Sequence, residues 1–237
     1  MRQDMNGLRW ISGVAASAAA VVILLISSFQ AAMYLDFGVY EREYTKYQVL
    51  KALDMEMEDA MYVTREMMAY LKGDRERLSV VTTVEGVRQD FFNEQDRLHM
   101  EDVQVLFLGG LSLRRWASAV LAAALALLAF VCRKDMWKTL AGSFQATLGV
   151  LAVCILLLGI AVARDFNAVF TKFHEIFFDN DLWLFDPATD YMIRMLPEGL
   201  FFDMVLRIGG FFLTGLGICL ALSIFCMVRV RKQSAAR

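Results

Sequence analysis

The sequence is poor in residues that interrupt or cross-link a chain. Its 237 residues include two prolines, and all four cysteines fall inside apolar stretches. A disulfide framework and a metal site built on cysteine are therefore not expected. An internal repeat and a low-complexity linker are also missing, which indicates a single membrane domain over residues 1–237.

The usual catalytic signatures are missing as well. No GxSxG, Walker-type phosphate loop or HExxH sequence is present, so serine-hydrolase, nucleotide-dependent and zinc-protease mechanisms have no support. Histidine is scarce, with only His99 and His174 in the whole chain. Any acid–base chemistry near neutral pH that uses imidazole must use these two residues.

Apolar residues are abundant, at 58% of the chain. Four segments are apolar over the roughly 20 residues that a helix needs to cross a bilayer. They cover about residues 11–35, 114–132, 144–163 and 207–228. We therefore predict an α-helical integral membrane protein with four transmembrane helices. The first segment is longer than a signal-peptide core, so we expect it to remain as a span.

Charge predicts the orientation. Lysine and arginine gather in both terminal tails and in the loop that contains Arg133, Lys134 and Lys138, which marks these parts as cytoplasmic. Segments 36–112 and 164–204 hold sixteen and eight of the 26 acidic residues, and we expect both to be extracellular. Arginines at outer span ends oppose this trend, and snorkelling to lipid headgroups explains them. They are Arg114, Arg115, Arg164 and Arg207.

Segment 36–112 is long enough to fold as a small extracellular cap. Leucine and methionine at helical spacing predict one amphipathic helix over residues 47–71. The stretch LSVVTT at residues 78–83 predicts a short strand. Residues 86–107 predict a second helix that ends near Gly109, before the second span.

The second outer segment contains a predicted interfacial helix at residues 166–178. On such a helix phenylalanines form one stripe opposite a charged face, as in helices that lie at a membrane surface. The stripe consists of Phe166, Phe170, Phe173 and Phe177. His174 lies on the shoulder of the stripe, on the side of Phe178. An interfacial histidine bonded to water or a carbonyl would explain it equally well.

Polar residues surround both histidines. Asp96 and Asp102 lie three residues before and after His99, and either carboxylate could hold one ring nitrogen. An ordinary solvated helix face would explain the same pattern. After the second histidine, Trp183 suits an interfacial belt. Turns are expected at Asn180, Asp181, Asp186 and Asp190.

Two stretches resemble a known family. FNEQDRLHMEDVQVLF and DFNAVFTKFHEIFFDNDLWLFDPATDYMIRMLPEGLFFDM closely resemble the bacterial lipoprotein intramolecular transacylase family. The four-span layout with an extracellular cap is similar too, and residues 40–86 match only in general pattern. Members move the sn-2 acyl chain of a diacylglyceryl lipoprotein onto the α-amino group of its N-terminal cysteine, leaving the lyso form.

The resemblance implies that His99 and His174 are the catalytic acid and base at the boundary between cap and membrane. Which histidine is the base stays open, although Asp102 favours His99. Supporting roles are implied for Asp102, Asn180, Asp181 and Asp186. An aromatic wall for the acyl chains is implied for Phe170, Phe173, Phe177, Phe178 and Trp183.

The implied partners are the diacylglyceryl lipoprotein and membrane lipid, with no nucleic acid and no nucleotide. Converting an ester to an amide is downhill, so we expect no cofactor and no metal. Two other readings stay open: a non-catalytic membrane protein that binds lipoproteins, and an intermolecular N-acyltransferase that uses phospholipid. A transporter is disfavoured, because no predicted span carries a charge pair near its middle.

Overall fold

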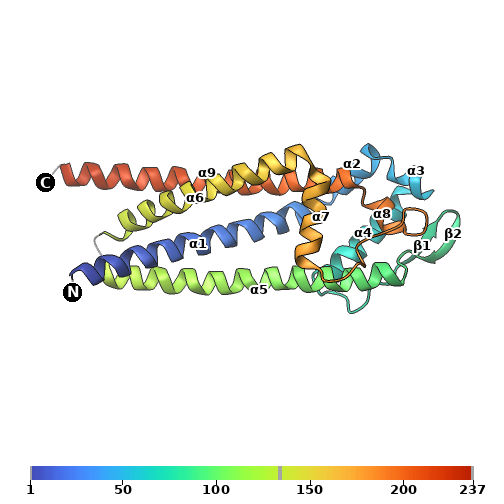
Figure 1. The fold of residues 1–237 in the computed structure, drawn as a ribbon, viewed down its shortest axis with the longest axis horizontal. Coiled ribbons are helices and arrows are strands. Elements are labelled where there is room, and N and C mark those ends of the chain that lie inside the picture. The colour runs from blue at the N-terminus through green and yellow to red at the C-terminus, as the bar shows by residue number, and fades with distance from the viewer. Residues whose placement is uncertain (1, 133–134, 236–237) are drawn as a thin grey trace. The chain divides into compact units, whose positions relative to one another are not determined.

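The computed structural model describes residues 2–132 and 135–235. Arg133 and Lys134, on which part of the predicted orientation depends, lie outside these ranges. In the described ranges four helices are long and apolar enough to cross a membrane, which confirms the predicted helical class (Figure 1). They are α1 (Arg2–Tyr34), α5 (Glu94–Val131), α6 (Met136–Arg164) and α9 (Glu198–Ala235). The exact bounds of each span stay a prediction.

The chain divides into two compact units. The first comprises Met1–Phe29, Ser112–Arg164 and Gly209–Arg237, and the second comprises Gln30–Leu111 and Asp165–Ile208. The first unit contains most of the apolar helical length. The second unit contains both histidines and is therefore the one that matters for chemistry. The predicted extents of a single domain and its cap remain predictions.

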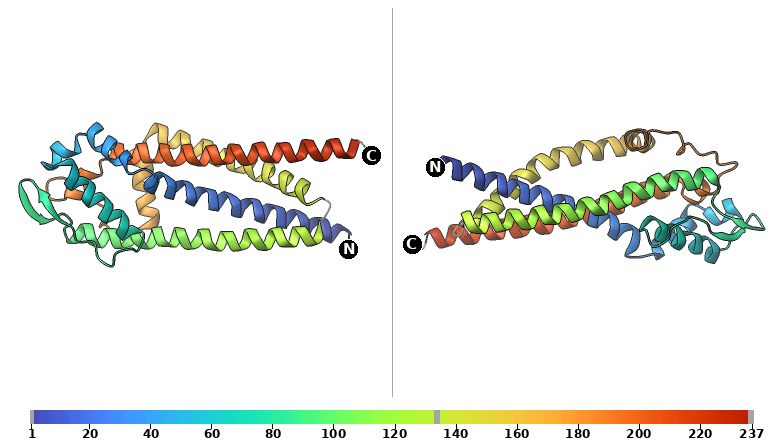
Figure 2. Two further views of the ribbon diagram at one scale, coloured as in Figure 1. Left: turned by 180° about the vertical axis from the view of Figure 1, so that it is seen from behind. Right: turned by 90° about the horizontal axis from the view of Figure 1, so that it is seen from below.

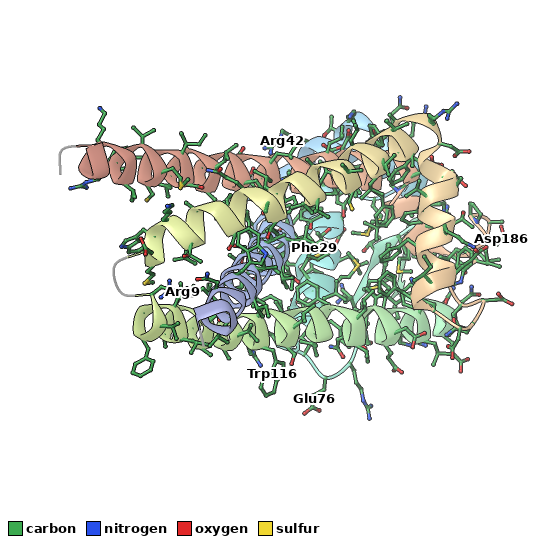
Figure 3. All side chains as sticks on the ribbon, turned by 60° about the vertical axis from the view of Figure 1, so that its left-hand side comes forward. Arg9, Phe29, Arg42, Glu76, Trp116 and Asp186 are labelled. Atoms are coloured by element: carbon green, nitrogen blue, oxygen red, sulfur yellow. The ribbon has the colours of Figure 1, made fainter. Side chains whose placement is uncertain are left out.

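Small and polar side chains join the helices of the first unit. Ser143, which is fully buried, lies so close to Gly13 that a methyl group there would overlap its hydroxyl. Gln145 of α6 donates to the Ser223 hydroxyl of α9 at 3.0 Å. Such contacts are typical of membrane helices, where small residues let backbones approach. On the outside, Trp116 is 70% exposed and projects away from α5 (Figure 3).

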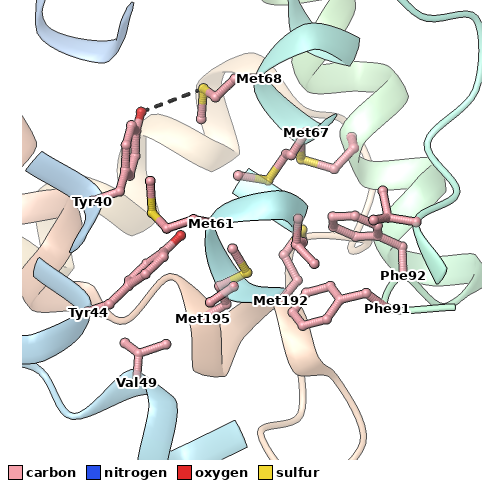
Figure 4. Packing of buried hydrophobic residues seen from close by; sticks show 14 of the residues in the cluster. Tyr40, Tyr44, Val49, Met61, Met67, Met68, Phe91, Phe92, Met192 and Met195 are labelled. Atoms are coloured by element: carbon pink, nitrogen blue, oxygen red, sulfur yellow. Dashed lines mark hydrogen bonds between the residues drawn. The ribbon is translucent and has the colours of Figure 1, made fainter. Parts of the chain in front are cut away.

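The second unit has its own hydrophobic core, rich in methionine and aromatic residues (Figure 4). Its elements are α2 (Gly38–Lys46), α3 (Val49–Leu53), α4 (Met57–Leu71), β1 (Val81–Val84), β2 (Val87–Asp90), α7 (Phe166–Phe177), α8 (Tyr191–Met195) and the near ends of α5 and α9. Tyr44 and Thr64 share a buried hydrogen bond of 2.6 Å within this core. Methionine side chains fill the irregular space between short helices because they are flexible and unbranched.

Three of the expectations for the cap are wrong in detail. The helix predicted over residues 47–71 is split into α3 and α4 because Asp54, between them, adopts left-handed backbone angles. Gln48 also does so, and α3 begins only after it. The strand predicted at 78–83 is shifted to β1. It pairs antiparallel with β2, whose residues were expected to be helical (Figure 2). The Glu85–Gly86 turn has positive φ at both positions, as tight hairpins require.

Helix α5 also differs from the prediction at both ends. It begins at Glu94, where Asn93 and Asp96 each accept a hydrogen bond from the other's backbone N–H, at 2.8 and 3.0 Å. This reciprocal cap defines the helix start. The helix does not end near Gly109 but continues to Val131. Glycine costs only about 1 kcal/mol in a helix, which is too little to end a long apolar one.

A close approach at the start of α9 gives a first testable prediction. A methyl group on Gly199 would overlap the Tyr47 ring, and the Tyr47 hydroxyl is held by Asp203 at 2.7 Å. We therefore expect Gly199→Ala to destabilise the protein by about 1–3 kcal/mol, as overpacking does. Thermal unfolding in detergent, followed by tryptophan fluorescence, measures the effect.

The matched control is Gly109→Ala in α5, where nothing lies within 4 Å of the added methyl group. This change should be neutral or slightly stabilising, because alanine favours helix. Equal unfolding temperatures for the two variants would contradict the contact between Gly199 and Tyr47.

Candidate active site

Helix α7 carries the second histidine and confirms the predicted helix closely. Asp165 caps its start by accepting a hydrogen bond from the Ala168 N–H at 2.9 Å. The phenylalanine stripe is only partly covered. Phe170 packs on Phe201 with ring centroids 5.0 Å apart, whereas Phe173 remains 42% exposed. The covered end of the stripe fixes α7 against the start of α9.

The two histidines of the chain lie together. His99 comes from α5 and His174 from α7, and their rings stack with centroids 6.0 Å apart and planes at 24°. Both side chains are buried, with residue exposures of 6% and 8%. A pair of stacked, buried imidazoles offers a proton acceptor and a proton donor within one small volume.

Hydrogen bonding fixes the tautomer of His174. Its Nδ1 lies 2.7 Å from the carbonyl oxygen of Phe170, which can only accept, so Nδ1 carries the proton. In the neutral ring Nε2 is then left as the proton acceptor. Phe170 and Trp183 flank the ring at 4.3 and 5.1 Å between centroids. Burial lowers the pKa of His174 below its ordinary value, and the Phe170 carbonyl offsets this only in part.

His99 lies among aromatic rings, and its Nδ1 lacks a hydrogen-bond partner among the described residues. Phe178 and Phe185 meet its ring edge-on at 5.2 and 5.3 Å. Its Nδ1 is buried and makes no hydrogen bond within the part of the chain that the structure describes. Asp102 instead accepts from the Asn180 side chain at 2.9 Å. The expected hydrogen bond between the His99 ring and the carboxylate of Asp96 or Asp102 is therefore not found in the described part of the chain.

A loop after α7 is fastened to α5 on both sides of His99. One turn before the histidine, the Gln95 side chain donates to the carbonyls of Leu182 and Leu184 at 3.1 and 3.0 Å. After the histidine, Asp102 holds Asn180. The loop thereby covers both imidazoles with aromatic rings. Gln95 was not predicted, although its position four residues before His99 puts it on the same helix face.

Two of the residues with an implied supporting role, Asp181 and Asp186, form turns in the loop after α7. Asp181 is exposed, and its backbone carbonyl accepts from the Leu184 N–H in a turn, at 3.1 Å. Asp186 also makes a turn, where its carboxylate accepts from the Ala188 N–H at 2.9 Å, and Figure 3 places it on the loop beyond α7. Both are turn residues as expected from their sequence. No interaction joins either to a histidine among the residues that the structure describes.

Two pockets border α5. The larger, about 570 Å³, is lined by charged residues such as Glu94, Arg97 and Glu101, and neither histidine lines it. The smaller, about 200 Å³, is lined by Asp102 of α5 and by Phe177 and Phe178 at the C-terminal end of α7. Phe178 also contacts both imidazoles. The smaller pocket therefore adjoins the histidine pair.

Comparison with known proteins gives a consistent result. The sequence profile of the family described as "Lipoprotein intramolecular transacylase Lit" matches residues 14–202. The solved structure of that transacylase from Bacillus cereus matches with a TM-score of 0.76 and 18% identity, covering 96% of this chain and 99% of the other. A variant of the same protein with a histidine replaced by alanine gives 0.74 and 18%, covering 98% and 100%. No curated protein sequence matches.

The four apolar helices and the structural relatives of the chain define it as an integral membrane protein with the fold of that transacylase. The family match covers most of the chain, so it belongs to the lipoprotein intramolecular transacylase family and is an acyltransferase. The family resemblance noted in the sequence is confirmed.

The buried environment of His174 predicts a lowered pKa for its imidazole. Because burial disfavours the imidazolium ion, we expect His174 to stay neutral to a lower pH than the 6.5 of a free histidine. NMR of ring-labelled histidine in a His99→Gln variant observes His174 alone. The midpoint should lie below 6.5 in the folded protein and return towards 6.5 after denaturation. A folded midpoint at or above 6.5 would mean that the ring is solvated or ion-paired.

Proposed function

We propose that the protein transfers the sn-2 acyl chain of a diacylglyceryl lipoprotein to the α-amino group of the lipoprotein's N-terminal cysteine. His99 and His174 supply the proton transfers. The observation that carries this proposal is the stacked, buried pair of the only two histidines in the chain. They come from helices far apart in sequence, and an aromatic enclosure surrounds them.

The reaction needs a base because the amine resists attack. An α-amino group has a pKa near 8, so much of it is protonated at neutral pH. A neutral imidazole can take a proton from nitrogen and deliver it to the departing glyceryl oxygen, which typically accelerates a reaction by about 10²–10⁴-fold. The product ester has lost one acyl chain, and the new bond is an amide.

The geometry favours His174 as the base. Its proton is held on Nδ1 by the Phe170 carbonyl, so Nε2 is positioned to accept. His99 then protonates the leaving oxygen or stabilises the developing oxyanion. This assignment replaces the preference for His99, which depended on Asp102, because Asp102 bonds to Asn180 instead.

Positioning supplies the other large contribution. The amine and the ester belong to one flexible molecule, and holding them in contact can contribute roughly 7–11 kcal/mol. The rings of Phe170, Phe178 and Trp183 are rigid and packed on the histidines. They form a wall on which the glyceryl group and acyl chains can be ordered, and they limit the water that would otherwise hydrolyse the ester.

The central experiment is mass spectrometry of the lipopeptide. Purified protein incubated with a diacylglyceryl lipoprotein should give an N-acyl, S-monoacylglyceryl product of unchanged mass, identified by fragmentation. His99→Ala and His174→Ala should each slow its formation by about 10²–10⁴-fold. Leu98→Ala, an exposed neighbour on α5, is the matched control and should keep full rate.

The outcomes separate the alternatives. If the folded wild-type protein binds the lipoprotein but forms no product, the alternative of a non-catalytic lipoprotein-binding protein is favoured. Full activity in either histidine variant would remove that histidine from the mechanism. With acyl-labelled phospholipid present, label should stay off the lipoprotein amine, whereas an intermolecular N-acyltransferase would transfer it.

We further propose that both termini are cytoplasmic and that the histidine pair lies on the extracellular side. The distribution of basic residues supports this orientation. A cysteine introduced at exposed Arg88, in a variant whose four native cysteines are serine, should react with an impermeant maleimide on intact cells. A cysteine at Lys138 should react only after lysis. The reverse labelling pattern would show that the termini are extracellular and the histidine pair is cytoplasmic.

A further inference from the structure

The smaller pocket beside the histidines has an unusual combination of walls. Its volume is about 200 Å³. Four of its lining side chains are apolar and the others are two carboxylates and one amide. They are Val105, Leu106, Phe177 and Phe178, with Asp102, Asp179 and Asn180. No basic side chain lines it. Its chemistry therefore suits a ligand with a cationic group beside an apolar chain.

Asp102 is the fixed carboxylate of this pocket. The Asn180 side chain donates to one of its oxygens at 2.9 Å, and Asn180 is itself held by the Leu182 N–H and the Trp183 indole N–H. A neutral amide orients a carboxylate without cancelling its charge. No lysine or arginine forms an ion pair with Asp102 in the described part of the chain. Its second oxygen is thus available for a cation.

The pocket is one aromatic ring away from the imidazoles. Phe178 lines it, and the same ring lies 5.2 Å from His99 and 5.5 Å from His174 between centroids. Asp102 follows His99 by three residues on α5, which brings the two side chains to neighbouring positions. A cation bound by Asp102 can therefore reach an imidazole if Phe178 shifts.

We propose that this pocket binds the protonated α-amino group of the substrate's N-terminal cysteine, with Asp102 as its counter-ion. The proposal depends on the proposed function, in which the free α-amino group of the substrate is the nucleophile. The thioether and glyceryl carbons would pack on the apolar wall. In this proposal Asp102 is a substrate-binding residue, and its observed hydrogen bond is to Asn180 and not to a histidine.

The proton balance is consistent with this role. The ammonium group held by Asp102 gives one proton to an imidazole, which later releases it to water. The neutral amine then attacks the acyl carbon. As the N–C bond forms and the C–O bond of the ester breaks, a second proton leaves nitrogen and reaches the glyceryl oxygen through the second imidazole. The products are an amide and a glyceryl hydroxyl.

Binding of an unreactive analogue tests the proposal. The probe is a cysteinyl peptide whose sulfur carries a dialkylglyceryl ether, which lacks the ester, compared with the same peptide after N-acetylation. In the unaltered protein at pH 7 we expect the free amine to bind about 10- to 100-fold more tightly, as charge-assisted hydrogen bonds allow. The preference should shrink by pH 10, where the amine is neutral.

Asp102→Asn should remove the preference and leave the affinity for the acetylated peptide unchanged, which also reports an intact pocket. Glu101→Gln is the matched control. It removes the same charge from the next residue of α5, which lines the larger pocket, and should keep the preference. Asp102→Glu should restore part of it.

Two results would overturn the inference. One is a preference that persists in Asp102→Asn, and the other is a preference in the unaltered protein that does not change between pH 7 and 10. Should Asp102→Asn fail to fold, the second result still decides. Product formation by the unaltered protein tests the proposed function separately. If the protein transacylates but its preference for the free amine depends neither on Asp102 nor on pH, the role of Asp102 is refuted and the proposed function stands.

Discussion

The site depends on how the loop after α7 is fastened to α5. Gln95 and Asp102 lie on one face of α5, on either side of His99, and each holds a different point of the loop. This double attachment brings Phe178, Trp183 and Phe185 over the imidazoles. Without it, His99 would be an ordinary histidine on the solvated face of a helix. The stacked pair is therefore a product of loop attachment as much as of helix packing.

Burial has opposite consequences for the two kinds of polar group in this site. For an imidazole it favours the neutral ring, which is the form that accepts a proton, and His174 gains this without losing its hydrogen bond to Phe170. For a carboxylate, burial without a partner is costly. Asp102 avoids that cost because Asn180 donates to it and one side of the residue faces a pocket. The site thus combines an imidazole that burial holds in its neutral form with a carboxylate that an amide orients.

Sequence patterns predicted the helical class and helix 166–178, and the family resemblance singled out the two histidines, whose catalytic role stays a prediction. The patterns did not predict the contact between the histidines, because ring stacking between α5 and α7 depends on tertiary packing that no local spacing encodes. The same limit explains the errors in the cap. Left-handed backbone at Asp54 splits a helix whose leucine and methionine spacing is continuous in the sequence. Residues 87–90 were predicted to be helical. The Glu85–Gly86 turn instead brings them into an antiparallel pair with β1. Asp102 was expected beside His99, but the competing amide of Asn180 could not be placed from sequence.

Water is the competitor that such a site must exclude. An ester beside a basic imidazole hydrolyses if water reaches it, whereas the proposed reaction requires attack by an amine from the same molecule. The rings of the loop cover both imidazoles and, in our proposal, limit the access of water. Asp102 helps to hold the loop through Asn180 and, in the same proposal, receives the amine on its other oxygen. One carboxylate would then connect occupancy by the correct nucleophile with the position of the loop. The resulting expectation is chemical selectivity: aminolysis is favoured when the amine holds Asp102, and the ester is protected from water over the same interval.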